Sequence, residues 1–166
     1  NKAAALFLVK KLLPELKSRG LKLSLLLAGA RPGPKIWRLS HHEGVVVKGW
    51  VEDIRDAYSD GRIFVAPMFT GLGLQNKILE AMSMGLPSVT TSMVNNAINA
   101  NPGEEMLIAD TVEGLADQIQ RLLEEEGLYK KLSTAARLFV LRHYVWEDQV
   151  KKLETVIQTK NAYAQI

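Results

Sequence analysis

Two glycines, a lysine and a glutamate follow a short apolar stretch in a pattern that suits a phosphate-bearing ligand. In residues 66–91, APMFTGLGLQNKILEAMSMGLPSVTT, Gly71 and Gly73 precede a helical pattern that carries Lys77 and Glu80. Glycine lacks a Cβ, so the backbone can approach a ligand closely and can adopt positive φ. The free N–H groups and the dipole of a helix's first turn favour a diphosphate. The segment therefore predicts a nucleotide or phosphate site at a helix N-terminus.

Glu80 is the candidate partner for a sugar. A carboxylate one turn into the helix can accept hydrogen bonds from two vicinal hydroxyls, as a ribose presents them. Its neighbours Leu79, Ala81 and Met82 predict a half-buried helix, in which an unpaired carboxylate is costly. Glycine-rich turns also occur for steric reasons, and a helical glutamate is often an ordinary surface residue. The alternative of no ligand therefore stays open on these residues alone.

Apolar runs and helical periodicities alternate along the chain and would place this loop at one edge of a parallel sheet. The apolar runs predict strands over residues 21–27, 45–47, 62–66, 88–91 and 106–109. The helical patterns between them cover residues 3–18, 35–42, 52–58 and 74–84, and a polar connection is predicted over 92–104. Pro14 predicts a kink or break near Leu13.

The C-terminal part of the chain is predicted to be entirely helical. Asp110 and Glu113 match a capping box at the start of its first helix. A second helix is predicted over residues 128–142. A third begins near Val145 and places on one face Trp146, Val150, Leu153 and Ile157. We expect these amphipathic helices to pack on the sheet rather than on a membrane.

This order of elements predicts an α/β fold, a doubly wound parallel sheet with additional C-terminal helices. In such sheets ligands bind beyond the carboxyl ends of the strands. Residues 71–75 follow one predicted strand and residues 49–53 follow another, so both loops are candidates for the binding site.

Composition bounds the remaining possibilities. The 166 residues suit one domain with a real core, and the net charge of +3 comes without a basic block that would indicate nucleic acid. The absence of cysteine excludes disulfides and thiolate metal sites, and the adjacent His41 and His42 do not match a metal-ligand pattern. No apolar run is long enough to span a bilayer. Because Asn1 leads directly into a helical pattern, we expect a fragment of a longer protein that lacks the preceding strand.

The run GLGLQNKILEAMSMGLPSV resembles the nucleotide-sugar-binding signature of GT-B glycosyltransferases in the retaining glycosyl transferases group 1 class. Three further segments resemble other parts of that family's C-terminal domain in the same order along the chain: LKLSLLLAG, VVVKGWVEDIRDAYSDGRIFVAP and MLIADTVEGLADQIQRLLEE. The resemblance covers nearly the whole chain. It implies a Rossmann-like half of a GT-B enzyme, a single donor-nucleotide-binding domain over residues 1–166 without its N-terminal acceptor domain.

The resemblance also implies roles for single residues. Glu80 matches the second glutamate of the family's E-x7-E pair, which bonds the ribose hydroxyls. The backbone amides of Asn76 and Lys77 match those that receive the diphosphate. The glycine loop, here Gly71 with the residues Gly73, Leu74 and Gln75, would contact the donor sugar. The base would lie near the turn formed by Gly49, Trp50 and Val51, where Trp50 either stacks on the base or is a core or interdomain tryptophan.

One departure from the family pattern concerns the first glutamate of that pair. The position eight residues before Glu80 is Leu72, and an alternative alignment with a two-residue insertion places Thr70 there. The carboxylate that usually faces the donor sugar is missing in both alignments. No catalytic residue is therefore assigned from the sequence.

The implied function is the donor-binding half of a retaining glycosyltransferase that acts without a metal or a separate cofactor. It would move a sugar from a UDP-, GDP- or ADP-sugar to a glycan or lipid-linked acceptor in the cytoplasm, with peripheral contact to the inner face of the membrane where the acceptor is lipid-linked. The alternatives are a non-catalytic nucleotide-sugar-binding module and a sugar-nucleotide epimerase or phosphorylase of the same architecture. A flavodoxin-like regulator would need an acidic cluster at the strand ends, which the sequence lacks.

Overall fold

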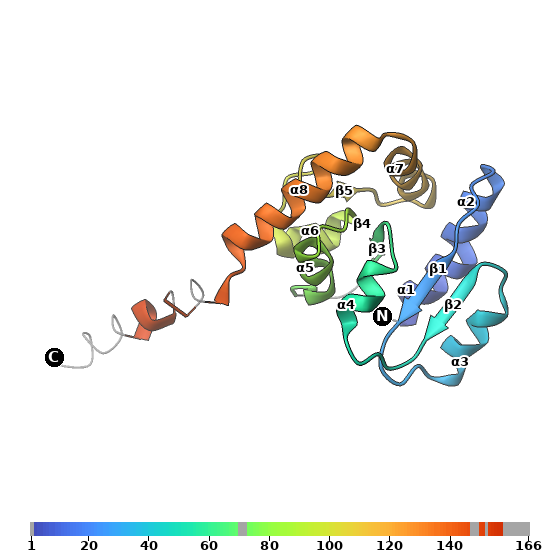
Figure 1. Cartoon of the computed structure of the whole chain (residues 1–166), viewed down its shortest axis with the longest axis horizontal. Coiled ribbons are helices and arrows are strands. Elements are labelled where there is room, and N and C mark those ends of the chain that lie inside the picture. The colour runs from blue at the N-terminus through green and yellow to red at the C-terminus, as the bar shows by residue number, and fades with distance from the viewer. Residues whose placement is uncertain (1, 70–72, 147–149, 152, 158–166) are drawn as a thin grey trace.

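The strands form two parallel sheets with helices packed against them (Figure 1). The computed structural model describes residues 2–69, 73–146, 150–151 and 153–157. The strands are β1 (Leu25–Ala28), β2 (Val45–Lys48), β3 (Phe64–Ala66), β4 (Ser88–Thr90) and β5 (Leu107–Ile108). The helical elements are α1 (Lys2–Phe7), η1 (Leu8–Leu12), α2 (Leu13–Ser18), α3 (Pro34–Trp37), η2 (Arg38–His41), α4 (Ile54–Ser59), α5 (Asn76–Ser83), α6 (Ser92–Ile98), α7 (Val112–Glu124) and α8 (Glu126–His143).

The predicted α/β class with parallel strands is confirmed, but the expected sheet is present in two parts. β1 pairs with β2 in one sheet, and β3, β4 and β5 pair in that order in the other. β4 has neighbours on both sides and is fully buried, whereas β3 and most of β1 are half-buried. β1 also begins four residues later than predicted, because the segment from Leu21 to Ser24 has no paired strand in the described chain.

The first helical stretch runs from α1 through α2 and is interrupted by the π-helical turn η1. Pro14 follows that turn at the second position of α2. Proline has no backbone N–H and clashes with the carbonyl four residues earlier, so the chain widens locally instead of breaking. The predicted kink near Leu13 therefore takes the form of a π turn.

The prediction of a polar connection over residues 92–104 was wrong for its first half, which forms α6. Val94 and Ile98, four residues apart, bury one face of this helix, although the asparagines around them suggested a loop. Asn99 ends the helix in the left-handed region at φ 61°, as a helix C-cap often does. Asn95 fixes the exit, since its side chain accepts from the amide of Ala100 and donates to the Ala100 carbonyl.

The predicted capping box at Asp110 and Glu113 was also wrong. Thr111 occupies the N-cap of α7, and its hydroxyl accepts a hydrogen bond from the Gly114 amide at 3.0 Å. Asp110 instead accepts from the amide of Ser92, the first residue of α6, at 2.9 Å. The carboxylate therefore satisfies a first-turn amide of a different helix, one that the sequence prediction had not recognised.

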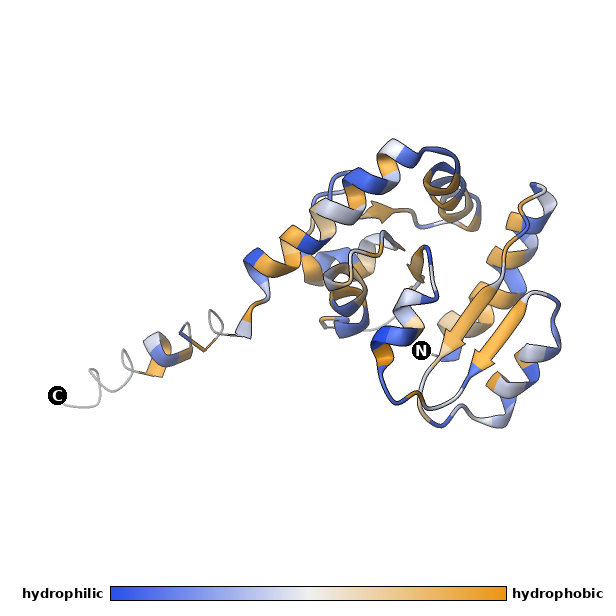
Figure 2. Ribbon diagram, in the orientation of Figure 1, coloured by the Kyte–Doolittle hydropathy of each residue, from blue (hydrophilic) through white to orange (hydrophobic). Residues whose placement is uncertain are grey.

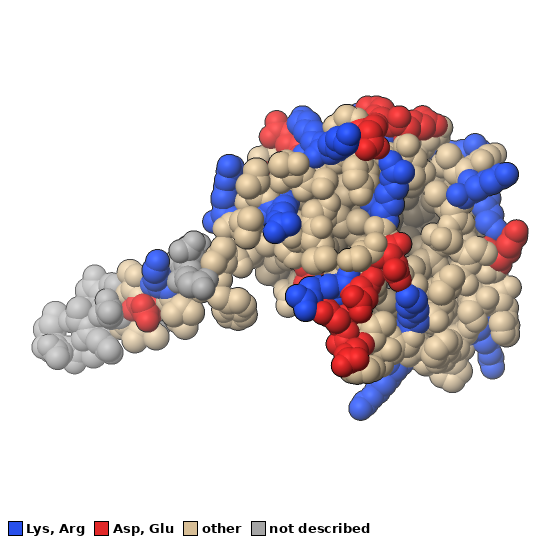
Figure 3. Space-filling view, viewed as in Figure 1, with Lys and Arg blue, Asp and Glu red and all other residues tan. Residues whose placement is uncertain are grey.

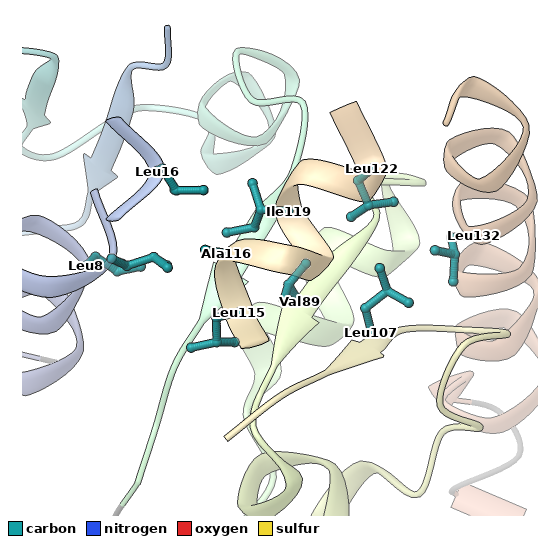
Figure 4. Close-up of a cluster of buried hydrophobic side chains, with 10 residues drawn as sticks. Leu8, Leu16, Val89, Leu107, Leu115, Ala116, Ile119, Leu122 and Leu132 are labelled. Atoms are coloured by element: carbon teal, nitrogen blue, oxygen red, sulfur yellow. The ribbon is translucent and has the colours of Figure 1, made fainter. Parts of the chain in front are cut away.

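The main core lies where α7 packs between the N-terminal helices and the second sheet (Figure 4). Leu8 and Leu16 approach α7 from one side, and Leu132 of α8 lies on the other. Apolar residues are concentrated on the strands and on the inward faces of the helices (Figure 2). A second cluster joins α5, α6 and α8 through the buried side chains of Ile78, Met82, Val94, Ile98, Ala136 and Phe139.

The last helical segment does not pack as predicted. Helices α7 and α8 cover the sheet, but residues 150–151 and 153–157 lie apart from the body of the molecule (Figure 1). Trp146 is 81% exposed and Leu153 is 60% exposed. The amphipathic pattern of this segment is real, but its apolar face contacts no sheet in the described structure.

Candidate functional site

The site begins at the N-terminus of α5. Gly73 has φ of +98°, and a Cβ added to it would meet nothing within 4 Å, so the backbone is open there. Gln75 occupies the N-cap, and the first intrahelical hydrogen bond runs from the Ile78 amide to the Gln75 carbonyl at 3.0 Å. The amides of Asn76 and Lys77 precede that bond and are the groups available to a ligand.

Leu74 and Gln75 are two further loop residues that were predicted to contact the donor sugar. The side chain of Gln75 donates weakly to the Gly73 carbonyl at 3.4 Å, and Leu74 is exposed. Gly71 and the two positions proposed for the missing glutamate, Thr70 and Leu72, lie outside the described residues.

Glu80 carries the most specific interaction of the site. The hydroxyl of Tyr58 in α4 donates a hydrogen bond to Glu80 Oε2 at 2.7 Å and lies 3.2 Å from the Lys77 carbonyl. The predicted half-buried helix is confirmed, since α5 buries Ile78, Ala81 and Met82, whereas Glu80 itself is on the exposed face. A tyrosine thus fixes the direction of a carboxylate whose remaining oxygen is open to a ligand.

Tyr58 was missed by the sequence analysis. It is buried, and a buried tyrosine hydroxyl usually finds a partner, but no local signal links it to a residue 22 positions away. Burial raises the pKa of Tyr58 well above its ordinary value of 10.0, and the hydrogen bond to Glu80 raises this pKa further. The phenol therefore stays a protonated donor throughout the physiological range.

We expect Tyr58→Phe to change the alkaline stability of the protein. The pKa of this phenol is higher in the folded state than in the unfolded state, so its contribution to stability is complete below pH 10.0 and is lost as pH rises toward the folded-state pKa. Above pH 10.0 the wild-type free energy of unfolding should therefore fall by up to about 1.4 kcal/mol per pH unit more than that of the variant. Urea unfolding at pH 8 to 11 measures this difference, and equal slopes for the two proteins would contradict it.

A large cavity of about 1290 Å³ reaches this site from the interior of the fold. At one end it is lined by Gln75, Lys77, Glu80 and Tyr58. Its lining includes two acidic residues, Asp60 and Glu80, and a larger basic set: Lys2, Lys22, Arg31, Lys35, Arg38, Lys48, Arg62 and Lys77. Figure 3 shows a recess on this face of the molecule with basic side chains on both sides of it. Two of these cations are already paired, Lys48 with Asp60 and Arg62 with Glu126. The excess of positive charge that remains favours an anionic ligand.

The predicted base-binding turn lies beside this cavity but not in its lining. Gly49, Trp50 and Val51 follow β2 directly, at the carboxyl edge of the first sheet. Trp50 is 73% exposed, so it does not pack in the core of the described chain. A Cβ at Gly49 would come within 3.5 Å of the Trp37 ring. The predicted base-binding turn therefore follows a strand of the first sheet, whereas the glycine loop follows a strand of the second. Both follow the carboxyl ends of their strands.

Other candidate residues have structural roles. Asp53 caps α4 by accepting from the Arg55 amide at 2.9 Å, and the hydrogen bonds from Arg55 lower the pKa of that carboxyl. Within the described part of the chain, His, Asp and Glu side chains form no group of three that could hold a metal ion. None of the described helices is long and apolar enough to cross a bilayer.

Two buried threonines shape the segment that leads into the glycine loop. The Thr90 hydroxyl donates to the Ala66 carbonyl at 2.8 Å, and the Thr91 hydroxyl donates to the Met68 carbonyl. Thr91 occupies the N-cap of α6, yet its side chain makes no capping hydrogen bond. The hydroxyl instead ties the end of β3 to β4 next to the site.

Thr91→Val should destabilise the protein by about 1–3 kcal/mol, because the isosteric valine leaves the half-buried Met68 carbonyl without its donor. Chemical denaturation gives the free energy of unfolding. Thr91→Ser keeps the hydroxyl and should lose clearly less. A valine variant as stable as the wild type would show that this hydrogen bond contributes nothing.

Comparison with known proteins gives one family and several similar folds. The family model described as Glycosyl transferases group 1 matches residues 1–125. A curated protein from Klebsiella pneumoniae, described as an uncharacterized 44.6 kDa protein in the cps region, is 28% identical over 93 residues, 56% of this chain and 24% of that protein. The chain thus spans about a quarter of this relative.

Two solved structures illustrate the shared fold. Sucrose-phosphate synthase from Thermosynechococcus elongatus aligns over 92% of this chain and 42% of its own with a TM-score of 0.75 at 22% identity. Anabaena HepE, solved in complex with UDP-glucose, aligns over 90% of this chain and 44% of its own with a TM-score of 0.76 at 16% identity. At these identities the likeness shows the fold, a Rossmann-like half of the GT-B architecture. Because the family model covers three quarters of the sequence, the chain belongs to the glycosyl transferases group 1 family of GT-B glycosyltransferases.

Proposed function

We propose that this chain is the donor-binding domain of a retaining glycosyltransferase. The complete protein would transfer a sugar from a nucleotide diphosphate sugar to a glycan or lipid-linked acceptor held by a second, N-terminal domain. With a lipid-linked acceptor it would act in the cytoplasm at the inner face of the membrane.

One observation carries this proposal: the carboxylate of Glu80, aimed by the Tyr58 hydroxyl, lies one turn beyond the open amides of Asn76 and Lys77. A diphosphate on those amides would place an attached ribose within reach of Glu80. A carboxylate accepts two hydrogen bonds from vicinal hydroxyls, which suits a ribose and does not suit a phosphate alone.

The structurally similar HepE, solved with UDP and with UDP-glucose, supports the choice of ligand class. If this chain binds a nucleotide diphosphate sugar, the candidate nucleotides are UDP, GDP and ADP. Trp50, exposed at the carboxyl edge of the first sheet, is the proposed stacking surface for the base. The loop residues Gly71, Gly73, Leu74 and Gln75 would contact the donor sugar.

The chemistry proposed is stabilisation of the leaving diphosphate. Negative charge accumulates on it as the bond to the sugar breaks. The α5 N-terminus and the Lys77 ammonium would lie where that charge develops and would stabilise the transition state. No metal is needed in this scheme, because helix dipole and cation supply the positive charge.

The proposal is tested by titrating UDP, GDP and ADP into the complete protein and measuring heat by calorimetry. We expect one of the three to bind with a Kd in the micromolar to millimolar range and the other two to bind more weakly. Failure of all three to bind at millimolar concentration would overturn the donor-domain assignment.

A non-catalytic nucleotide-sugar-binding module is the second candidate, and the Leu72 position favours it. Where the family carries a sugar-facing glutamate, this chain has Leu72 or Thr70. This candidate predicts that the complete protein binds the nucleotide sugar but neither transfers nor hydrolyses it. It also predicts that Leu72→Glu restores no turnover if the other catalytic groups are lost as well. Turnover by the unchanged protein would reject it.

A further inference from the structure

The two faces of α8 differ in what they contact. Its inner face packs against α5 and α7, as expected from the sequence, and buries Leu132, Ala136 and Phe139. Its outer face carries two large apolar side chains in solvent, since Leu138 is 42% exposed and Leu141 is 53% exposed. Residues three apart share one side of a helix, so these two leucines form a short apolar row on the side opposite the core.

Two rows of cations border the apolar row. Lys130 and Arg137 are seven residues apart and lie on one side of it, whereas Lys131 and Arg142 are eleven residues apart and lie on the other. All four side chains belong to exposed residues. Figure 1 places α8 at the front of the molecule, and Figure 3 shows basic side chains along it with uncharged surface between them.

Acidic residues do not balance these cations. The sequence has no Asp or Glu over residues 127–146. Glu126, at the start of the helix, lies 3.7 Å from Lys130, and the other three cations form no ion pair within the described part of the chain. Glu105, which lines a pocket with His143 at the end of α8, already accepts a backbone hydrogen bond. An ordinary solvated helix face mixes both signs of charge, which this face does not.

An exposed tryptophan extends this surface beyond the helix. Trp146 lies three residues after His143, the last residue of α8, and is 81% exposed. Tryptophan has a large apolar ring with one polar N–H group, so it is costly in water and suits an interface between an apolar phase and water.

We propose that the outer face of α8, together with Trp146, docks on the surface of a bilayer that contains anionic phospholipids. The two leucines and the tryptophan enter the boundary between headgroups and acyl chains. The cations of both rows reach the lipid phosphates through their long side chains, and each is attracted by the negative surface potential. The inner face of α8 stays in the core, so docking requires no unfolding. Because three side chains bury little apolar area, the contact is reversible and depends on anionic lipid.

Other occupants fit this face less well. A nucleic acid would pair with the cations but would leave the leucines in water. A protein partner would cover the leucines, but lysine is depleted in protein interfaces. An apolar row between two rows of long cationic side chains matches the layers of a lipid surface, where acyl chains lie beneath phosphates.

This inference deepens one part of the proposed function, the action at a membrane, and rests on that proposal for the choice of a membrane. In the described chain, no residue of α8 lines the cavity beside Glu80. Vesicle binding is measured without nucleotide, and nucleotide binding is measured without vesicles. The failure of one proposal therefore leaves the other standing.

Cosedimentation of the complete protein with lipid vesicles tests the inference. We expect binding to phosphatidylcholine vesicles that contain phosphatidylglycerol, little binding to phosphatidylcholine alone, and weaker binding as salt is raised. Lys131→Gln combined with Arg142→Gln should weaken binding to the anionic vesicles by about 20- to 30-fold, since one cation near the surface contributes roughly fivefold. Leu138→Ser combined with Leu141→Ser keeps every charge and should still weaken binding by about tenfold.

Lys10→Gln combined with Lys11→Gln is the matched control, because it removes the same charge from exposed residues of η1. It should leave vesicle binding within about twofold. Absence of binding to anionic vesicles, or equal losses in the control and the α8 variants, would overturn the proposal. Binding of duplex DNA through the same cations, without binding of vesicles, would assign the face to a nucleic acid and overturn it too.

Lysine acetylation of the unsubstituted complete protein gives a second test that no folding defect can obscure. Docking places Lys130 and Lys131 among lipid headgroups, so anionic vesicles should slow their acetylation several-fold. Lys10 and Lys11 should react at unchanged rates. Mass spectrometry of the peptides measures all four sites. Unchanged rates at Lys130 and Lys131 in vesicle-bound protein would show that another surface makes the contact and contradict the proposal.

Discussion

Glu80→Gln is expected to weaken nucleotide binding by about 10- to 100-fold. A hydrogen bond to a charged group contributes about 1.5–3 kcal/mol, and each 1.4 kcal/mol corresponds to a tenfold change in Kd. Glutamine keeps the size of the side chain but has only one accepting oxygen. The Tyr58 hydroxyl and a ribose hydroxyl would therefore compete for that single oxygen. Calorimetric titration of the nucleotide into wild type and variant measures the change.

Glu104→Gln is the matched control, since it removes the same charge from an exposed residue outside the cavity lining. It should leave Kd within about twofold. A Glu80→Gln variant that binds like the wild type would remove the ribose role and with it the observation on which the proposed function rests.

The pairing with Tyr58 adds a sharper measurement. Tyr58→Phe should weaken binding in the wild-type background, because the freed carboxylate must be reoriented when the ligand binds. The same substitution in the Glu80→Gln background should have little further effect, because the group that Tyr58 positions has already been changed. Additive effects of the two substitutions would show that Tyr58 acts on the ligand independently of Glu80.

Leu122→Ala is expected to cause the largest loss of stability, about 2–5 kcal/mol. Leu122 is 0% exposed on α7, in the cluster that connects the N-terminal helices, the second sheet and α8 (Figure 4). Truncation removes buried methyl groups and leaves a cavity that close-packed neighbours such as Leu132 fill only partly. Urea unfolding monitored by circular dichroism measures the change in the free energy of unfolding.

Leu141→Ala on α8 provides the comparison, because the same atoms are removed from a side chain that is 53% exposed. Its loss should remain below about 1 kcal/mol. Equal losses for the two variants would mean that the cluster around α7 is not the main core of the fold.

Local sequence was sufficient to predict most elements. Short apolar runs predicted the five strands, and the helical patterns for α5, α7 and α8 were placed within two residues at most ends. These predictions succeeded because period and composition act over one turn of a helix or a few residues of a strand. The N-terminus of α5 as the anion-binding element was predicted for the same reason, since a glycine loop and the helix behind it are adjacent in sequence.

The failures involve choices between local alternatives that distant residues decide. Asp110 and Thr111 can both cap a helix, and the Ser92 amide, 18 positions away, takes the carboxylate. The asparagines of α6 suggested a loop. Neighbouring elements bury Val94 and Ile98, and this burial favours a helix. Residues 153–157 have an amphipathic pattern, but their period does not determine which surface covers the apolar face.

By itself, the sequence determined the α/β class, the family, and the loop, helix and carboxylate that form the candidate site, because each depends on residues close together in the chain. Only the tertiary structure decided that Tyr58 aims the exposed carboxylate of Glu80, that basic residues from several elements line one cavity, and that the strands pair in two separate sheets. Those features join residues many positions apart, and their contacts depend on packing and on backbone pairing, which leave no periodic signal in the sequence.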